Sequence, residues 1–282
     1  MLKRRAMSVQ AIEINNLYQR LDSLHHDEHL YLLVDVLSWP EGLAQAQSLD
    51  PQVNMVKLFM GTQLSNVMDV SPWVIEINDQ SKTLLEQVAE KKIGIVYIST
   101  LSLSNFQQSI TPLLIASMPA INDKQPHQVL LSFYRPSVAQ GIALMNIGLL
   151  SFGACIEIWI PAARHQQWQS YTCHQTLPAR AILLTPELHQ SIDEQYYQYW
   201  LGGFGNWQSH SDEDFTKAAR IVYLLKQNHV TRELPILMWL DWLQWHIQEI
   251  DIETILPIIR QDKPALARLE QVKLLVKDSG DE

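Results

Sequence analysis

The stretch His127–Met145, HQVLLSFYRPSVAQGIALM, decides the fold because a strand-like run meets a helical one inside it without a glycine. The residue before a proline is kept out of the α region, so Arg135 must stay extended. Pro136 has a fixed φ that suits the first helical position, where its missing N–H costs nothing. The sequence therefore predicts a strand over residues 128–134 and a helix from Pro136. Arg135 and the start of that helix are expected at the edge of a sheet, where such folds often place sites.

On both sides of this stretch, short apolar runs alternate with helical patterns. The apolar runs predict strands at residues 30–36, 54–61, 71–78, 93–100 and 155–161. The helical patterns predict helices at residues 9–24, 80–92 and 105–118, the last bent at Pro112, and a short helix starting near Trp39. This order is typical of an α/β lobe in which helices flank a mixed sheet.

The pattern changes after Leu184, where we expect only helices. Thr185-Pro186-Glu187 supplies a cap, a proline at the first helical position and an acid in the first turn, and Gly202-Gly203 ends that helix. Ser211 with Asp214 resembles a capping box for the next helix. Two more are predicted within 233–250 and 264–277. We therefore expect an α/β lobe over residues 1–184 and an all-helical carboxy-terminal lobe over residues 185–282.

Composition excludes several classes of function. The chain has 282 residues and a formal net charge of -9, from 21 basic and 30 acidic residues, which disfavours binding to nucleic acid. Lys3-Arg4-Arg5 is not followed by an apolar signal segment, and the apolar stretch 144–160 contains Asn146 and Glu157, so we expect no membrane insertion. Two cysteines make no disulfide framework. These features predict a cytoplasmic protein.

Few residues suggest catalysis, and we expect no catalytic, cofactor-binding or metal-binding residues and no cofactor. His25–His29, HHDEH, is the most metal-like cluster, but a polar loop at a helix end explains it as well. Asp35 follows a buried strand, where an aspartate more often caps the next turn. Cys173 and His174 are adjacent on a predicted extended segment, so their side chains point apart. The alternative that stays open is a metal-dependent or carboxylate-based hydrolase using Asp35 and the histidine cluster.

Aromatic residues gather in the predicted helical lobe, and six of them are candidates for contact with a partner protein. They are Tyr196, Tyr197, Trp200, Trp239, Trp242 and Trp245. The three later tryptophans recur every third residue in a helix that is apolar on most sides. Such a helix is either a central core helix or one that offers a face to a partner, and both interpretations stay open.

Four segments resemble the DUF4123 family, and the resemblance covers roughly residues 28–200. YLLVDV, which contains Asp35, and SPWVIEI look like the family's first and third strands, and LLSFYRP looks like its middle motif. ILLTPELHQSIDEQ is similar to the segment that opens the family's helical part. Ser132 and Arg135 stand where the family usually has Arg and Asp, so an ion pair of that form is not expected here.

The resemblance implies a cytoplasmic, non-enzymatic chaperone or adaptor of the type VI secretion system. Its partners would be a secreted effector toxin, held by its amino-terminal or another apolar segment, and the spike protein onto which the toxin is loaded. Low charge, at 18% of residues, and clustered aromatics fit this expectation.

Overall fold

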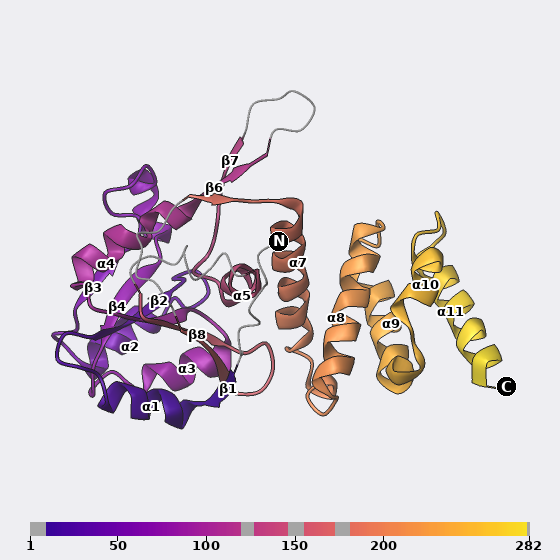
Figure 1. Cartoon of the computed structure of the whole chain (residues 1–282), viewed down its shortest axis with the longest axis horizontal. Helices are drawn as coiled ribbons and strands as arrows, with labels where there is room; N and C mark the ends of the chain where they lie inside the picture. The colour runs from indigo at the N-terminus through magenta and orange to yellow at the C-terminus, as the bar shows by residue number, and fades with distance from the viewer. Residues whose placement is uncertain (1–9, 120–126, 146–154, 173–180, 281–282) are drawn as a thin grey trace, which may run out of the picture. The chain divides into compact units, whose positions relative to one another are not determined.

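The computed structural model describes residues 10–119, 127–145, 155–172 and 181–280. The chain divides after Gln195 into two compact units, here called the amino-terminal and the carboxy-terminal unit. All described strands lie in the amino-terminal unit, and every described element from residue 186 onward is a helix (Figure 1). The predicted fold class, an α/β lobe followed by an all-helical one, is confirmed. The two units divide inside α7 (Pro186–Leu201), the helix predicted to open the second lobe.

A seven-stranded sheet forms the centre of the amino-terminal unit, in the order β1-β9-β8-β5-β2-β4-β3. Every pair of neighbouring strands in it is antiparallel, and Leu32 of β2 pairs with Ile75 on one side and Val96 on the other. The strands are β1 (Gln10–Glu13), β2 (His29–Val34), β3 (Met55–Lys57), β4 (Trp73–Ile77), β5 (Ile95–Ser99), β8 (Glu157–Pro161) and β9 (Gln167–Thr172).

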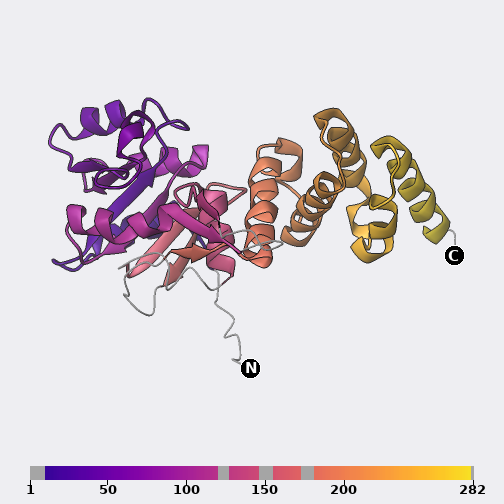
Figure 2. The same cartoon turned by 90° about the horizontal axis from the view of Figure 1, so that it is seen from above.

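Helices lie on both faces of this sheet, which explains why the central strands read as continuous apolar runs (Figure 2). Leu30 and Leu32 pack with α1 (Ile14–Asp22), α2 (Gly42–Leu49) and α3 (Leu84–Lys91). Tyr31 and Leu33 face the opposite layer, which contains α4 (Leu103–Ile110), α5 (Pro136–Leu144) and the start of α7. Alternate residues of one strand thus serve two separate cores.

The junction at Arg135–Pro136 forms as predicted. Arg135 is extended, with φ −88° and ψ 131°, and α5 begins at Pro136. The strand before it is shorter than expected, because β7 (His127–Leu130) ends four residues before the predicted end. Leu131 is bound through its N–H to the carbonyl of Leu114, and Phe133 enters the core, so the chain turns where the sequence suggested continued pairing.

A second, three-stranded sheet of order β10-β6-β7 corrects the predicted helix over 105–118. α4 ends at Ile110, a 3-10 turn (Thr111–Leu114) follows, and Ile115–Met118 is strand β6. Pro112 cannot donate a backbone hydrogen bond, and the residues after it gain partners in β7 and in β10 (Ile182–Leu183). Pairing with distant strands therefore outweighs local helical spacing here.

Two further predictions in the amino-terminal unit were wrong in their limits. Residues 10–13, placed in the first helix, form β1 because they pair with β9. β9 itself was not predicted, since its sequence QWQSYT is mostly polar, with only Trp168 and Tyr171 buried. The strand predicted to reach Gly61 ends at Lys57, and Gly61 adopts a positive φ of 73° in a turn.

The carboxy-terminal unit contains α8 (Asp212–Gln227), α9 (Glu233–His246), α10 (Ile252–Ile259) and α11 (Ala265–Gly280). Ser211 caps α8 as predicted, accepting a hydrogen bond from the N–H of Asp214 at 3.1 Å. α10 was not predicted. Asp251 caps it, and the hydrogen bond from Thr254 lowers the pKa of this carboxyl below its usual value. None of the helices in the described part of the chain combines the length and apolar character needed to cross a bilayer.

Candidate functional site

The carboxy-terminal unit has an open pocket of about 300 Å³ between α7, α8 and α9, which we call the aromatic groove. α7 contributes Tyr196, Tyr197 and Trp200, three of the six predicted partner-binding residues. The other lining residues are Val222, Lys226, Thr231, Glu233 and Ile236. The groove thus brings aromatic rings together with one cation and one carboxylate.

The spacing of the aromatic residues along α7 determines where their rings lie in the groove. Tyr196 and Trp200 are four residues apart and therefore share one side of α7. Tyr196 is 55% exposed and meets Tyr197 edge to face, with 5.2 Å between ring centroids. Tyr197 in turn lies 6.4 Å from the ring of Tyr223 on α8. Aromatic pairs of this kind hold rings in place while leaving apolar surface available to a ligand or protein.

The α8–α9 loop closes one side of the groove. The chain leaves α8 through a Schellman motif, in which Val230 donates to the carbonyl of Leu225 and His229 takes a positive φ of 65°. Lys226 then donates from Nζ to the carbonyl of Thr231 at 3.1 Å. The loop is therefore tied to α8 at both ends and presents Thr231 as a fixed wall.

The structure does not bring the three α9 tryptophans to the groove. Trp239 is 0% exposed and donates from its indole nitrogen to the carbonyl of Ala265 at 3.0 Å. Trp242 is partly buried and stacks on His246. Trp245 is 77% exposed. Residues spaced three apart do not lie on one line along a helix. Trp239 is therefore in the core, Trp242 is partly buried and Trp245 is exposed to solvent.

The outward face of α9 carries a stripe made of Leu234, Met238, Asp241 and Trp245, and only Trp245 among them was predicted from the sequence to contact a partner. Leu234 is 69% and Met238 44% exposed, while Ile236, Leu240 and Leu243 on the opposite face are buried. The spacing of four, three and four residues is the signal that could have found this α9 stripe. α9 therefore has a buried core face and an exposed face with three large apolar residues, and contact of that exposed face with a partner stays a prediction.

Asp35, the carboxylate considered for catalysis, caps the turn after β2. Its Oδ1 accepts from the N–H of Leu37 at 3.0 Å, and its Oδ2 accepts from Ser38 Oγ at 3.0 Å and from Arg135 Nε at 3.2 Å. The carboxylate is buried, whereas the guanidinium is half exposed. Asp35 thus links the end of β2 to the residue that opens α5, and the chain has an ion pair although the family's usual residues are absent.

We expect the change Asp35→Ala to lower the free energy of unfolding by about 2–3 kcal/mol, because several hydrogen bonds to a charged group are lost. Arg135→Gln should cost about 1 kcal/mol or less, since water can replace a half-exposed partner. Chemical denaturation of both variants measures the difference. Asp27→Ala, at an exposed aspartate that precedes the other end of β2, is the control. Equal losses for Asp35→Ala and Asp27→Ala would contradict the capping role.

In the structure, the side chains of Glu28 and His29 in the histidine cluster, His25–His29, pair with different partners, and the cluster does not form one site. His29 Nδ1 lies 2.7 Å from Glu76 Oε1, and Glu28 pairs with Arg20 at 3.0 Å. The N–H of His25 also donates to Glu28. Within the described ranges, no three His, Cys, Asp or Glu side chains come close enough to hold a metal ion. Cys155 is buried, and Cys173 and His174 lie outside the described residues.

Comparison with known proteins matches part of the chain to a family model. No curated protein and no solved structure matches the chain. Three of the four segments that resemble the family, those around Asp35, Trp73 and Arg135, fall inside the matched range, and the fourth, at residues 182–195, falls outside it. Residues 30–145, somewhat less than half of the chain, match the family model described as a domain of unknown function, DUF4123.

Proposed function

We propose that this protein is a cytoplasmic, non-enzymatic chaperone or adaptor that binds a type VI secretion effector and helps to load it onto the spike protein. The match of residues 30–145 to DUF4123 supports this proposal through the role that the resemblance implies for the family. The exposed aromatic groove is the observation that carries it, because a chaperone needs apolar surface that its own fold leaves open.

Shielding is the physical mechanism that we propose. An effector with apolar or membrane-inserting segments would aggregate on its own, and binding to the folded chaperone lowers the population of exposed forms. A few aromatic anchors that become desolvated at an interface supply much of the affinity. Tyr196 and Trp200 offer such anchors in the aromatic groove, and Trp245 offers one on the α9 stripe.

Affinity purification of the tagged chain from its native cells tests the proposal. Mass spectrometry should identify a secreted toxin and a spike protein among the recovered proteins. The double change Tyr196→Ala and Trp200→Ala should reduce toxin recovery about tenfold or more, because truncating a hot-spot residue costs about 2 kcal/mol or more and about 1.4 kcal/mol already corresponds to a factor of ten.

Leu37→Ala is a matched control, since Leu37 is also an exposed apolar residue but lies in the amino-terminal unit. The Leu37→Ala variant should recover as much toxin as the wild-type chain does. Recovery of neither toxin nor spike by the wild-type chain would contradict the proposed function. Equal recovery with the double variant would contradict the role of the aromatic groove alone.

A further inference from the structure

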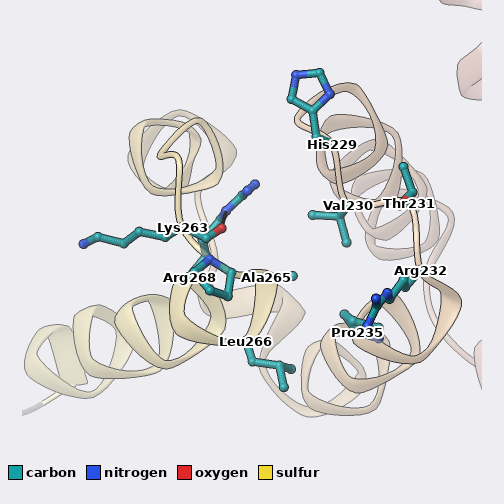
Figure 3. Close-up of a pocket in the computed structure, with 10 residues that line it drawn as sticks. His229, Val230, Thr231, Arg232, Pro235, Lys263, Ala265, Leu266 and Arg268 are labelled. Carbon is teal, nitrogen blue, oxygen red and sulfur yellow. Dashed lines mark hydrogen bonds between the residues drawn. The ribbon is translucent and has the colours of Figure 1, made fainter.

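A second pocket of the carboxy-terminal unit, of about 340 Å³, lies between the α8–α9 loop and the start of α11. We call it the basic pocket, because His229, Arg232, Lys263 and Arg268 line it and no acidic residue is among its lining residues in the described chain. Arg268 and Arg232 lie on different sides of it, while the side chain of Lys263 points away (Figure 3). In a chain of net charge -9, this is a local excess of positive charge.

Arg268 is held rigidly at one wall of the basic pocket. It is 6% exposed, and it donates from Nε to the carbonyl of Lys263 at 2.7 Å. Its Nη1 donates to the carbonyls of Ile259 and Asn228, at the ends of α10 and α8. These acceptors are neutral, and within the described residues Arg268 has no carboxylate partner and its Nη2 makes no hydrogen bond.

Arg232 supplies an exposed cation opposite this fixed one. It occupies the N-cap position of α9, where a guanidinium cannot make a capping hydrogen bond because it has no acceptor atom. It is exposed and, among the described residues, forms no ion pair. A guanidinium with all its donors available can bind a carboxylate with two parallel hydrogen bonds. The first turn of α11, which starts at Ala265, adds the positive end of a sixteen-residue helix.

Apart from Thr231, the rest of the basic pocket is apolar, which limits the kind of anion that fits. Val230, Pro235, Ala265 and Leu266 are among its lining residues. A free inorganic anion would use only the guanidinium groups and leave this surface hydrated. A carboxylate attached to an apolar body would satisfy the charge and bury the apolar wall together.

We propose that the basic pocket binds a carboxylate carried by an apolar group, with Arg232 as its main ligand and Arg268 as a fixed second donor. Two sources share this chemistry, the carboxy terminus of a polypeptide that ends in an apolar residue and a free small organic acid. The proposal does not depend on the proposed chaperone function, because it concerns a different pocket and is tested with purified components.

Isothermal titration calorimetry with three probes tests it: N-acetyl-leucine, an acetylated hexapeptide ending in leucine with a free carboxylate, and the same peptide as its amide. The wild-type chain should bind at least one free acid with a Kd of roughly 1 mM or tighter. Binding of N-acetyl-leucine supports the site and shows that a small acid suffices, whereas binding of the peptide acid alone supports it with a polypeptide as the source.

The change Arg232→Gln should raise the Kd about tenfold, corresponding to the loss of one charged contact worth 1.4 kcal/mol. Arg260→Gln removes an exposed arginine of the same unit that does not line the pocket, so the Kd should stay unchanged. Equal affinity for peptide acid and amide, equal weakening by the two arginine changes, or no heat from either free acid at about 10 mM would overturn the proposal.

Discussion

Replacing Gly141 by valine is expected to destabilise the amino-terminal unit more than any surface substitution. Gly141 lies in α5, and a Cβ built there would come 2.7 Å from the Cα of Ile192 and 2.9 Å from its backbone nitrogen on α7. Ser191 also donates from Oγ to the carbonyl of Gly141 at 3.0 Å. The two helices are therefore in backbone contact, and no side-chain rotation can make room.

The direction of the stability change expected for Gly141→Ala makes this prediction specific. Alanine normally stabilises a helix interior by about 1 kcal/mol relative to glycine. At residue 141 we expect the opposite, a loss of about 1–3 kcal/mol for Gly141→Ala from overpacking and a larger loss for Gly141→Val. Differential scanning calorimetry should show the transition temperature falling by about 2–4 °C for each kcal/mol lost.

Gly205→Ala is the control for Gly141, because nothing lies within 4 Å of a Cβ built at Gly205. It should change the free energy of unfolding by about 0.5 kcal/mol or less. If Gly141→Ala were as stable as the wild type, the close approach of α5 to α7 would be wrong. The packing of the Arg135–Pro136 helix against the start of α7 would then need another explanation.

Features that depend on a few neighbouring residues could be predicted from the sequence. The extended Arg135 and the helix from Pro136 follow from the steric limits of proline, and the cap at Ser211 follows from one hydrogen bond three residues away. β2 was found because burial on both faces demands a continuous apolar run. Each of these rules acts within a single element.

Features that depend on distant partners could not be predicted. β6 and β9 exist because other strands pair with them, and their own spacing or polarity points elsewhere. The Asp35–Arg135 pair joins residues one hundred positions apart, and Arg268 binds carbonyls that belong to three different segments. The candidate site shows the same limit, since aromatic content was visible in α9 but its distribution between core and solvent was not.

The tryptophans of α9 allow a test of that distribution, and Trp239→Ala is expected to have a very large effect on stability. Trp239 is fully buried, so truncation leaves a large cavity and also removes the hydrogen bond to the carbonyl of Ala265. We expect the free energy of unfolding of the carboxy-terminal unit to fall by about 3–5 kcal/mol. Trp239→Phe keeps much of the volume and should lose mainly the hydrogen bond, about 0.5–1.5 kcal/mol.

Unlike Trp239→Ala, Trp245→Ala should have little effect on stability, because this side chain is exposed on the α9 stripe. Its free energy of unfolding should stay within about 0.5 kcal/mol of the wild type. If the α9 stripe contacts the proposed effector, recovery of that effector should nevertheless fall about tenfold. Denaturant unfolding and affinity purification of the same three variants separate the two roles. A Trp245→Ala loss as large as that of Trp239→Ala would show that both rings are core residues and that α9 has no face available to a partner.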